Sequence, residues 1–133
     1  MRDQLAAWLL NIVRRMGAWA WVGNIVAWFL RVWGGRLLMH RIRETETLQA
    51  FDHPMPSYPV HIVIVPKQAI RSITALDASQ TQLLGEVVVM VEELVKVFEL
   101  EASGYRLVVN GGAYQEIPQL HFHLVSGSPS EKE

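Results

Sequence analysis

Two histidines, His121 and His123, are separated by a single phenylalanine in a chain of 133 residues that holds five histidines in all. Apolar residues alternate with them in the run QLHFHLV at residues 119–125, and this alternation predicts a β-strand. Because successive side chains of a strand point to opposite faces, we expect both imidazoles on one face and the apolar residues on the other. Imidazole is the side chain best suited to act as acid, base or nucleophile near neutral pH.

Other residues suited to phosphate chemistry precede this pair. The run HIVIVPK begins at His61, directly after a proline-rich turn at residues 54–59. The run YRLVVNGG, residues 105–112, ends in Asn110 and two glycines, which let backbone approach a phosphate closely. Asn110 and Gln115 offer neutral hydrogen-bond donors. A second imidazole beside a nucleophile can hydrogen-bond a phosphoryl oxygen or a leaving group, so these residues together favour a phosphate site.

The same histidines allow two other interpretations. One is a pair of half-buried strand histidines with ordinary hydrogen bonds. The other is a zinc site formed by His121, His123, His61 and His53, because neutral imidazoles are good zinc ligands. We predict no metal, since the chain has no cysteine and no carboxylate can be assigned to orient the ligands. No glycine-rich loop of the Walker type is present, and we predict no cofactor.

Over residues 43–127 the chain resembles the histidine triad (HIT) family of nucleotide hydrolases and transferases. The shared features come in family order: a strand before Phe51, the Pro-x-His-aliphatic-Pro-Lys strand, a long helix, Gly-Tyr-Arg leading to Asn110, and Gln115 ahead of the histidine strand. This collinearity is more specific than any single motif. The resemblance implies an α+β fold in which an antiparallel sheet is combined with a long helix, and an enzyme that acts on a nucleoside phosphate.

The resemblance also assigns roles to the histidine strand. The family pattern is His-φ-His-φ-His-φ-φ, where φ is apolar, so Gln119 stands in place of the first histidine. His121 takes the position of the nucleophile that attacks the α-phosphorus and forms a transient nucleotidyl-histidine. His123 takes that of the histidine that meets the phosphate and bridging oxygens. Gln119 can still hydrogen-bond but cannot carry a positive charge.

Upstream positions follow from the same resemblance. Asn110 and Gln115 would contact the phosphate region, and His61 would be a supporting histidine. The ribose-binding position, where the family usually has Asp or Asn, lies eight residues before His61 and holds His53. A shift of one residue in this turn would bring Asp52 to the ribose instead.

A noncatalytic protein is the competing hypothesis. Glu116 occupies a position where relatives often carry a small hydroxyl residue, and a carboxylate there would repel a phosphate unless it points away. With Gln119 in the triad as well, the chain could be a HIT-like accessory subunit that serves a membrane complex as scaffold or ligand sensor.

The N-terminal residues differ in composition from the rest of the chain. Residues 1–43 have a net charge of +6 and contain all five tryptophans, whereas residues 44–133 have a net charge of −7. Residues 2–16 form a cationic amphipathic helix when plotted at 100° per residue, and the pattern changes phase beyond Gly17. The uncharged stretch at residues 16–30 is too short to span a bilayer. We therefore expect an amphipathic head that lies on a membrane surface or binds a membrane-protein complex.

Packing of this head on the domain or across a homodimer is the alternative. Nucleic acid is not an expected partner, because the arginines are interleaved with bulky aliphatic residues and the remainder is acidic. The predicted organisation is a helical head at residues 1–35, a HIT-like domain at residues 36–127 and a flexible tail at residues 128–133. We expect a homodimer that is cytoplasmic and peripheral on the membrane.

Secondary structure completes the prediction. A strand with a turn near Glu46, at residues 43–51, joins strands at residues 61–66, 105–110 and 119–125 in the sheet. The helix is expected to start at Asp77 and Gln80 and to end near Leu100. Its apolar positions cover more than one stripe, so a second subunit or the head should pack on its outer side.

Overall fold

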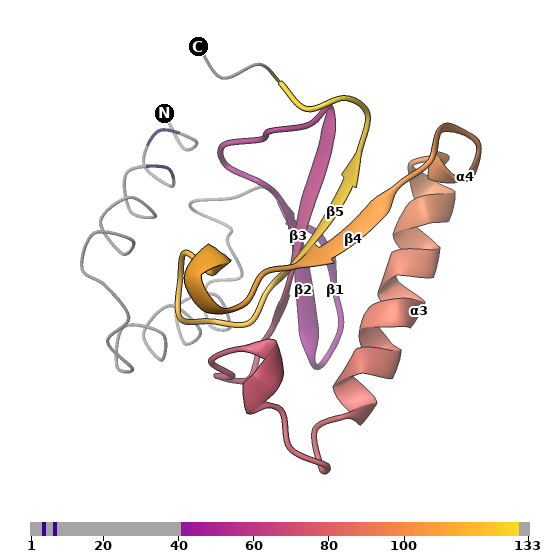
Figure 1. Ribbon diagram of the computed structural model, residues 1–133. Helices are drawn as coiled ribbons and strands as arrows, with labels where there is room; N and C mark the ends of the chain where they lie inside the picture. The colour runs from indigo at the N-terminus through magenta and orange to yellow at the C-terminus, as the bar shows by residue number, and fades with distance from the viewer. Residues whose placement is uncertain (1–3, 5–6, 8–40, 131–133) are drawn as a thin grey trace.

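The computed structural model describes Gln4, Ala7 and residues 41–130 (Figure 1). The predicted head, residues 1–35, lies outside the described residues except for those two positions. Within the described part of the chain, no helix has the length and apolar character needed to cross a bilayer.

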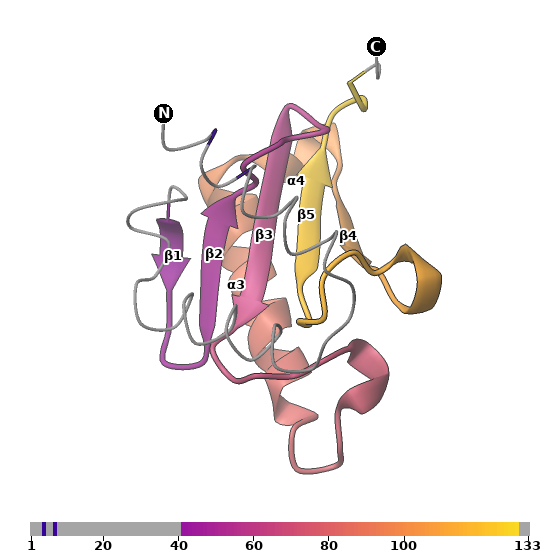
Figure 2. The same ribbon diagram turned by 90° about the vertical axis from the view of Figure 1, so that its left-hand side faces the viewer.

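Five strands form one antiparallel sheet in the order β1-β2-β3-β5-β4. Their bounds are β1 Arg41–Glu44, β2 Leu48–Asp52, β3 Val60–Pro66, β4 Arg106–Val109 and β5 Phe122–Ser126. Figure 2 shows the sheet with the long helix behind it. The predicted α+β fold with an antiparallel sheet is confirmed, and the predicted turn near Glu46 joins β1 to β2.

The long helix, α3, spans Gln82–Val97 and covers one face of the sheet. A short helix α4 (Leu100–Ser103) and two 3-10 turns, η1 (Ile73–Ala75) and η2 (Gly112–Tyr114), complete the fold. The predicted helix bounds were partly wrong. Asp77 N–H does donate to Gln80 Oε1 at 3.0 Å, but a turn follows before the helix begins. Glu99 adopts a left-handed φ of 55°, which separates α3 from α4.

The main core lies between α3 and the sheet. Alternate residues of β3, Ile62 and Ile64, are fully buried against the helix side, together with Leu120 and Phe122. The opposite face of β3 carries His61, Val63 and Val65, and the two valines join Phe51 in a second buried cluster. The side chains of His61, Val63 and Val65 therefore point away from α3.

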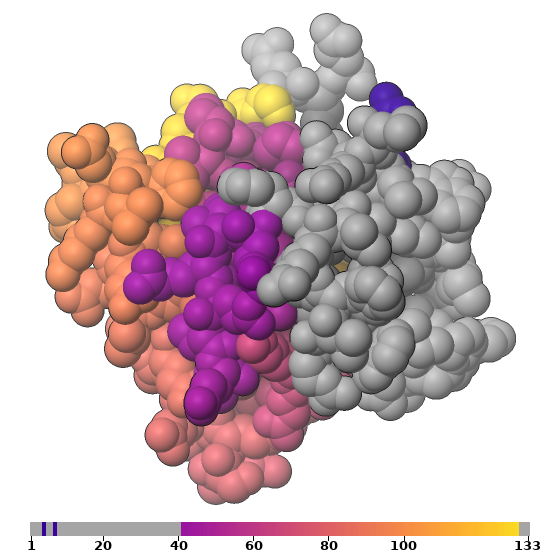
Figure 3. Space-filling model, turned by 180° about the vertical axis from the view of Figure 1, so that it is seen from behind, coloured from indigo at the N-terminus to yellow at the C-terminus, as the bar shows by residue number. Residues whose placement is uncertain are grey.

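Two surfaces of the domain expose apolar side chains. Val88 and Val97 on the outer side of α3 are each 62% exposed, which confirms more than one apolar stripe on this helix. Strand β4 is an edge strand whose residues are all exposed. Figure 3 shows β1 and β2 next to α3, where Arg43 Nε lies 2.6 Å from Glu93 Oε2.

Candidate active site

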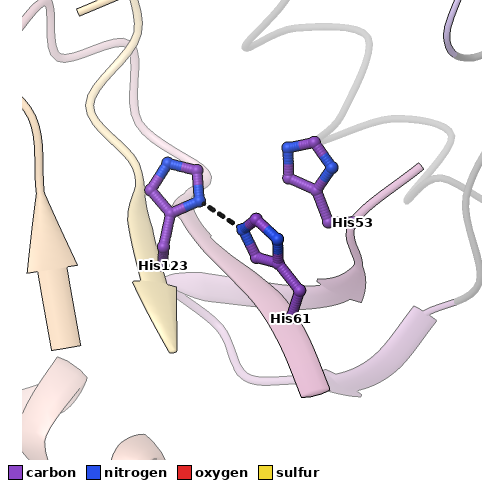
Figure 4. A group of neighbouring side chains, drawn as sticks. All are labelled: His53, His61 and His123. Carbon is purple, nitrogen blue, oxygen red and sulfur yellow. Dashed lines mark hydrogen bonds between the residues drawn. The ribbon is translucent and has the colours of Figure 1, made fainter. Parts of the chain in front are cut away.

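Three neighbouring strands bring three histidines into one row. In the β3–β5 register His61 is opposite Val125 and His123 is opposite Val63, so the two histidines are diagonal neighbours on one face. His53 directly follows β2, and its backbone N–H donates to the His61 carbonyl at 2.8 Å. Ring centroids are 4.3 Å apart for His53 and His61 and 5.1 Å apart for His61 and His123 (Figure 4).

His121 reaches this row from outside the regular sheet. Strand β5 begins at Phe122, so the prediction of a strand from residue 119 was wrong at its start. Leu120 N–H instead donates to the Ile70 carbonyl at 2.7 Å, which draws this stretch toward the loop after β3. The His121 ring still lies 4.9 Å from the His123 ring, edge to face. The two imidazoles are thus side by side, as the alternation predicted.

Backbone hydrogen bonds fix which nitrogen of each imidazole carries the proton. Ser57 N–H donates to Nδ1 of His61 at 3.0 Å, and a nitrogen that accepts a hydrogen bond holds no proton. The proton of neutral His61 is therefore on Nε2, which lies 2.9 Å from Nδ1 of His123 and donates to it. His123 in turn holds its proton on Nε2, where it forms an N–H donor.

His121 carries its proton on the other ring nitrogen, Nδ1. Its Nδ1 lies 2.8 Å from the Gln119 carbonyl oxygen and must donate to it, so the lone pair of His121 is on Nε2. An imidazole with this tautomer can attack phosphorus through Nε2, while the carbonyl stabilises the positive charge that develops on the ring. The orienting group is the backbone of Gln119, not its side chain.

The Gln119 side chain serves the neighbouring loop. It is 1% exposed, and its Nε2 donates to the carbonyls of Gln68 and Leu120, each at 3.3 Å. Its Oε1 is buried and has no hydrogen-bond partner in the described part of the chain. An unsatisfied buried acceptor of this kind costs about 1–3 kcal/mol.

All four clustered imidazoles have a lowered pKa, and burial is the largest cause for each. The pKa of His61 falls to about 4, with His53 as the second cause. The pKa of His123 falls to about 3, with His121, His61 and His53 as the causes that follow burial. The pKa values of His53 and His121 are lowered as well, although the Glu116 carboxylate acts in the opposite direction on both. At pH 7 the imidazoles are neutral, which leaves the lone pair on Nε2 of His121 available.

A metal ion fits this cluster poorly. Ligand atoms of His53, His61 and His123 all lie within 4.8 Å of one another. However, Met55 N–H donates to Nδ1 of His53 at 2.9 Å, just as Ser57 N–H donates to His61. Binding a metal through Nε2 would require a proton on each Nδ1, facing a backbone N–H. The hydrogen bonds therefore favour N–H donors over metal ligands.

Two other predicted site residues, Asn110 and Gln115, lie in the segment between β4 and β5. Asn110 directly follows β4, whose last register pair is Val109 with Phe122, so it lies at the end of this edge strand next to the start of β5. Gln115 uses both amide hydrogens on the loop, since its Nε2 donates to the Arg71 carbonyl at 2.6 Å and the Ile117 carbonyl at 2.9 Å. Gln115 would have to release one of them to donate to a phosphate.

His53, and not Asp52, belongs to the histidine row. Asp52 ends β2 and is exposed, and strand alternation directs its side chain to the face opposite His53. Sequence reasoning missed Ser57, because it acts through its backbone N–H and any residue except proline could supply one.

The C-terminal segment holds the loop that carries Ser57. Ser130 N–H donates to the Ser57 carbonyl at 2.7 Å, so the predicted flexible tail is hydrogen-bonded at this residue. Gly127 has a φ of +91°, and a Cβ placed there would lie 2.7 Å from Cγ of Pro59. The close packing of Gly127 on Pro59 thus depends on the absence of a side chain.

The HIT domain family matches residues 38–130. A HIT-like protein of Chlamydia pneumoniae is 33% identical over 103 residues, which cover 76% of this chain and 93% of that protein. The purine nucleoside phosphoramidase of Escherichia coli K12 is 28% identical over 90 residues, covering 66% of this chain and 76% of the enzyme.

The fold agrees with these matches. The crystal structure of a HIT family hydrolase from Legionella pneumophila superimposes with a TM-score of 0.68 at 28% identity, and the match covers 75% of this chain and 91% of that one.

Proposed function

The chain belongs to the HIT domain family, and on that premise we propose that it hydrolyses or transfers nucleoside phosphates at the α-phosphorus, with His121 as nucleophile. One observation carries this proposal. The ring centroids of His121 and His123 are 4.9 Å apart, and the two rings are opposite tautomers. His121 has a lone pair on Nε2, whereas His123 has an N–H there. A phosphoryl group between them would meet a nucleophile and a hydrogen-bond donor at once.

The reaction has two steps. Nε2 of His121 forms a bond to phosphorus while the bond from phosphorus to the leaving group breaks, and the ring becomes cationic with its Nδ1–H held by the Gln119 carbonyl. The bound phosphate favours uptake of one proton at Nδ1 of His61, where it displaces the hydrogen bond from Ser57 N–H. The Nε2 proton of His61 then shifts to Nδ1 of His123, and the Nε2 proton of His123 passes to the leaving group. Water then attacks phosphorus, gives its proton back to the pair, and releases His121.

The named relatives suggest a substrate class. The E. coli relative is a purine nucleoside phosphoramidase, and the Legionella structure is described as a hydrolase. Adenosine 5′-phosphoramidate is therefore the first substrate to assay. We expect release of AMP that His121→Ala reduces by about 10³-fold or more. Turnover that is absent, or equal in wild type and His121→Ala, would contradict the enzymatic proposal.

The noncatalytic alternative has one observation in its favour. The buried Gln119 side chain is committed to the loop at Gln68, whereas the resemblance has a histidine at this position. A protein that binds AMP but does not turn over any phosphoramidate or dinucleoside polyphosphate would fit an accessory subunit of a membrane complex.

We also propose that residues 1–35 attach the domain peripherally to a membrane on its cytoplasmic side, and that the exposed β4 edge and outer side of α3 join two copies. Seven arginines and five tryptophans in residues 1–43 support attachment. Co-sedimentation with anionic liposomes tests it, since a chain starting at Arg36 should lose binding. Sedimentation velocity of the full chain tests the dimer, for which Val88→Glu should favour the monomer.

A further inference from the structure

The histidine row presents donors to a ligand and almost no acceptors. Nδ1 of His53 and of His61 each accept a backbone N–H, so both rings carry their proton on Nε2. His61 uses its Nε2–H on His123. Nε2–H groups of His53 and His123 remain without a hydrogen-bond partner among the described residues.

The rings that carry these two donors lie close together. The ring centroids of His53 and His123 are 5.8 Å apart with an interplanar angle of 30°, and His61 contacts both. Figure 4 shows the His61 ring between the rings of His53 and His123. His123 lies between His121 and His53, because its ring contacts both. A ligand whose first phosphate is at His121 therefore reaches His53 with a different group.

The side chain at position 53 donates a hydrogen bond, whereas a carboxylate at this position would accept one. The resemblance assigns this position to the ribose, where Asp or Asn would accept hydrogens from the sugar hydroxyls. The backbone of Met55 occupies the acceptor nitrogen of His53, so the ring offers only a donor. A phosphate monoester has acceptor oxygens and matches such a surface better than a hydroxyl, whose hydrogen would find no acceptor in the row.

We propose that His53 makes this site select nucleotides that carry a second phosphate on the ribose. This inference rests on the proposed function, because it takes the first phosphate to lie at His121. The Glu116 carboxylate acts electrostatically on both His53 and His121, and it limits the gain from an added anion. We therefore expect a preference of about tenfold, the size of one good charge-assisted hydrogen bond.

Calorimetric titration of the full chain with AMP and with adenosine 2′,5′- and 3′,5′-bisphosphate tests the proposal. For wild type we expect one bisphosphate to bind about tenfold tighter than AMP. The ratio of the two affinities should fall to about one in His53→Leu and below one in His53→Asp, which has an acceptor and a negative charge. His53→Gln, which retains an N–H donor, should keep part of the preference.

Equal affinities in wild type, or a ratio that is the same in His53→Leu and His53→Gln, would overturn the inference. Hydrolysis of adenosine 5′-phosphoramidate on the same preparations separates it from the proposed function. If turnover depends on His121 but the second phosphate adds nothing, only the role of His53 is wrong. If no nucleotide binds and no turnover occurs, the proposed function and this inference both fail.

Discussion

Nε2 of His61 lies 2.9 Å from Nδ1 of His123, and through this contact the backbone at Ser57 determines the tautomer of a histidine on another strand. In the proposed reaction His61 acts as a positioning residue, since it need not touch the phosphate itself. Its two hydrogen bonds require an acceptor on one side and a donor on the other. A glutamine side chain has both.

We therefore expect His61→Gln to retain most of the activity and His61→Leu to lose about 10²-fold in kcat/KM, because leucine leaves the His123 tautomer undefined. Nitrogen-15 NMR of the imidazoles gives an independent measurement. Wild type should show His53, His61 and His123 protonated on Nε2 and His121 protonated on Nδ1. A mixed tautomer at His123 in wild type, or equal activities of the two variants, would rule out the relay from Ser57.

Stability should depend on pH through the same histidines. The pKa values of His61 and His123 in the folded chain are about 4 and about 3, below the ordinary value of about 6.5 in the unfolded chain. Between these values the unfolded state binds protons that the folded state does not, so the free energy of unfolding decreases as pH falls through 6.5. Above pH 7 this contribution is fully present.

Urea denaturation at pH 7.5 and pH 5 measures this loss. The difference between the two pH values should be smaller in His61→Gln, which cannot titrate. An unfolding free energy that rises on acidification over this range would contradict the lowered pKa values.

Binding of a phosphate should raise the pKa of His123, whereas burial lowers it. A phosphate beside His123 favours its charged form, so binding of AMP at pH 6 should take up a fraction of a proton. Calorimetry in two buffers of different ionisation enthalpy detects this uptake as a difference in apparent binding enthalpy. His123→Gln should show less uptake than wild type, and an unchanged value would assign the proton to another group.

The side chain of Gln119 offers a direct test of the departure from the family pattern that the resemblance implies at this position. Gln119→His removes the buried, unsatisfied Oε1, so the free energy of unfolding should rise by about 1 kcal/mol where the ring fits the space of the amide. Activity should change less than tenfold, because the His121 tautomer depends on the backbone carbonyl of residue 119. A large gain in activity would instead show that the missing first histidine limits catalysis.

Much of this arrangement could be predicted from the sequence, and the rest could not for definable reasons. Alternation of apolar residues gave the sheet, and the spacing of His121 and His123 predicted that their rings would lie together, because a local pattern determines both. The departure of residues 119–121 from the strand depends on a hydrogen bond between Leu120 and Ile70, which are fifty residues apart. No local pattern encodes such a contact.

The tautomers of the clustered histidines could not be predicted, for a different reason. They are set by backbone groups of Ser57, Met55 and Gln119, and backbone atoms have no residue-specific signature. Likewise, the choice between Asp52 and His53 depended on the register of β2 against β3, where a shift of one residue reverses the face. Residues 1–35 lie outside the described part of the chain except at two positions, so the amphipathic head stays a prediction.

A substitution just after the end of β5, outside the histidine row, should also affect the histidines. Gly127→Ala places a methyl group 2.7 Å from Cγ of Pro59 at a φ of +91°, a conformation that alanine rarely adopts. We expect the free energy of unfolding to decrease by about 1–3 kcal/mol, because either the loop or the end of β5 must move.

The matched control is Gly85→Ala in α3, where a Cβ meets nothing within 4 Å and helix propensity should raise stability by about 0.5–1 kcal/mol. Movement of the loop would carry Ser57 away from His61, so Gly127→Ala should also lower kcat/KM and shift the His123 tautomer in the NMR spectrum. If Gly127→Ala destabilised the chain but left that tautomer unchanged, the loop would not be the element that positions His61.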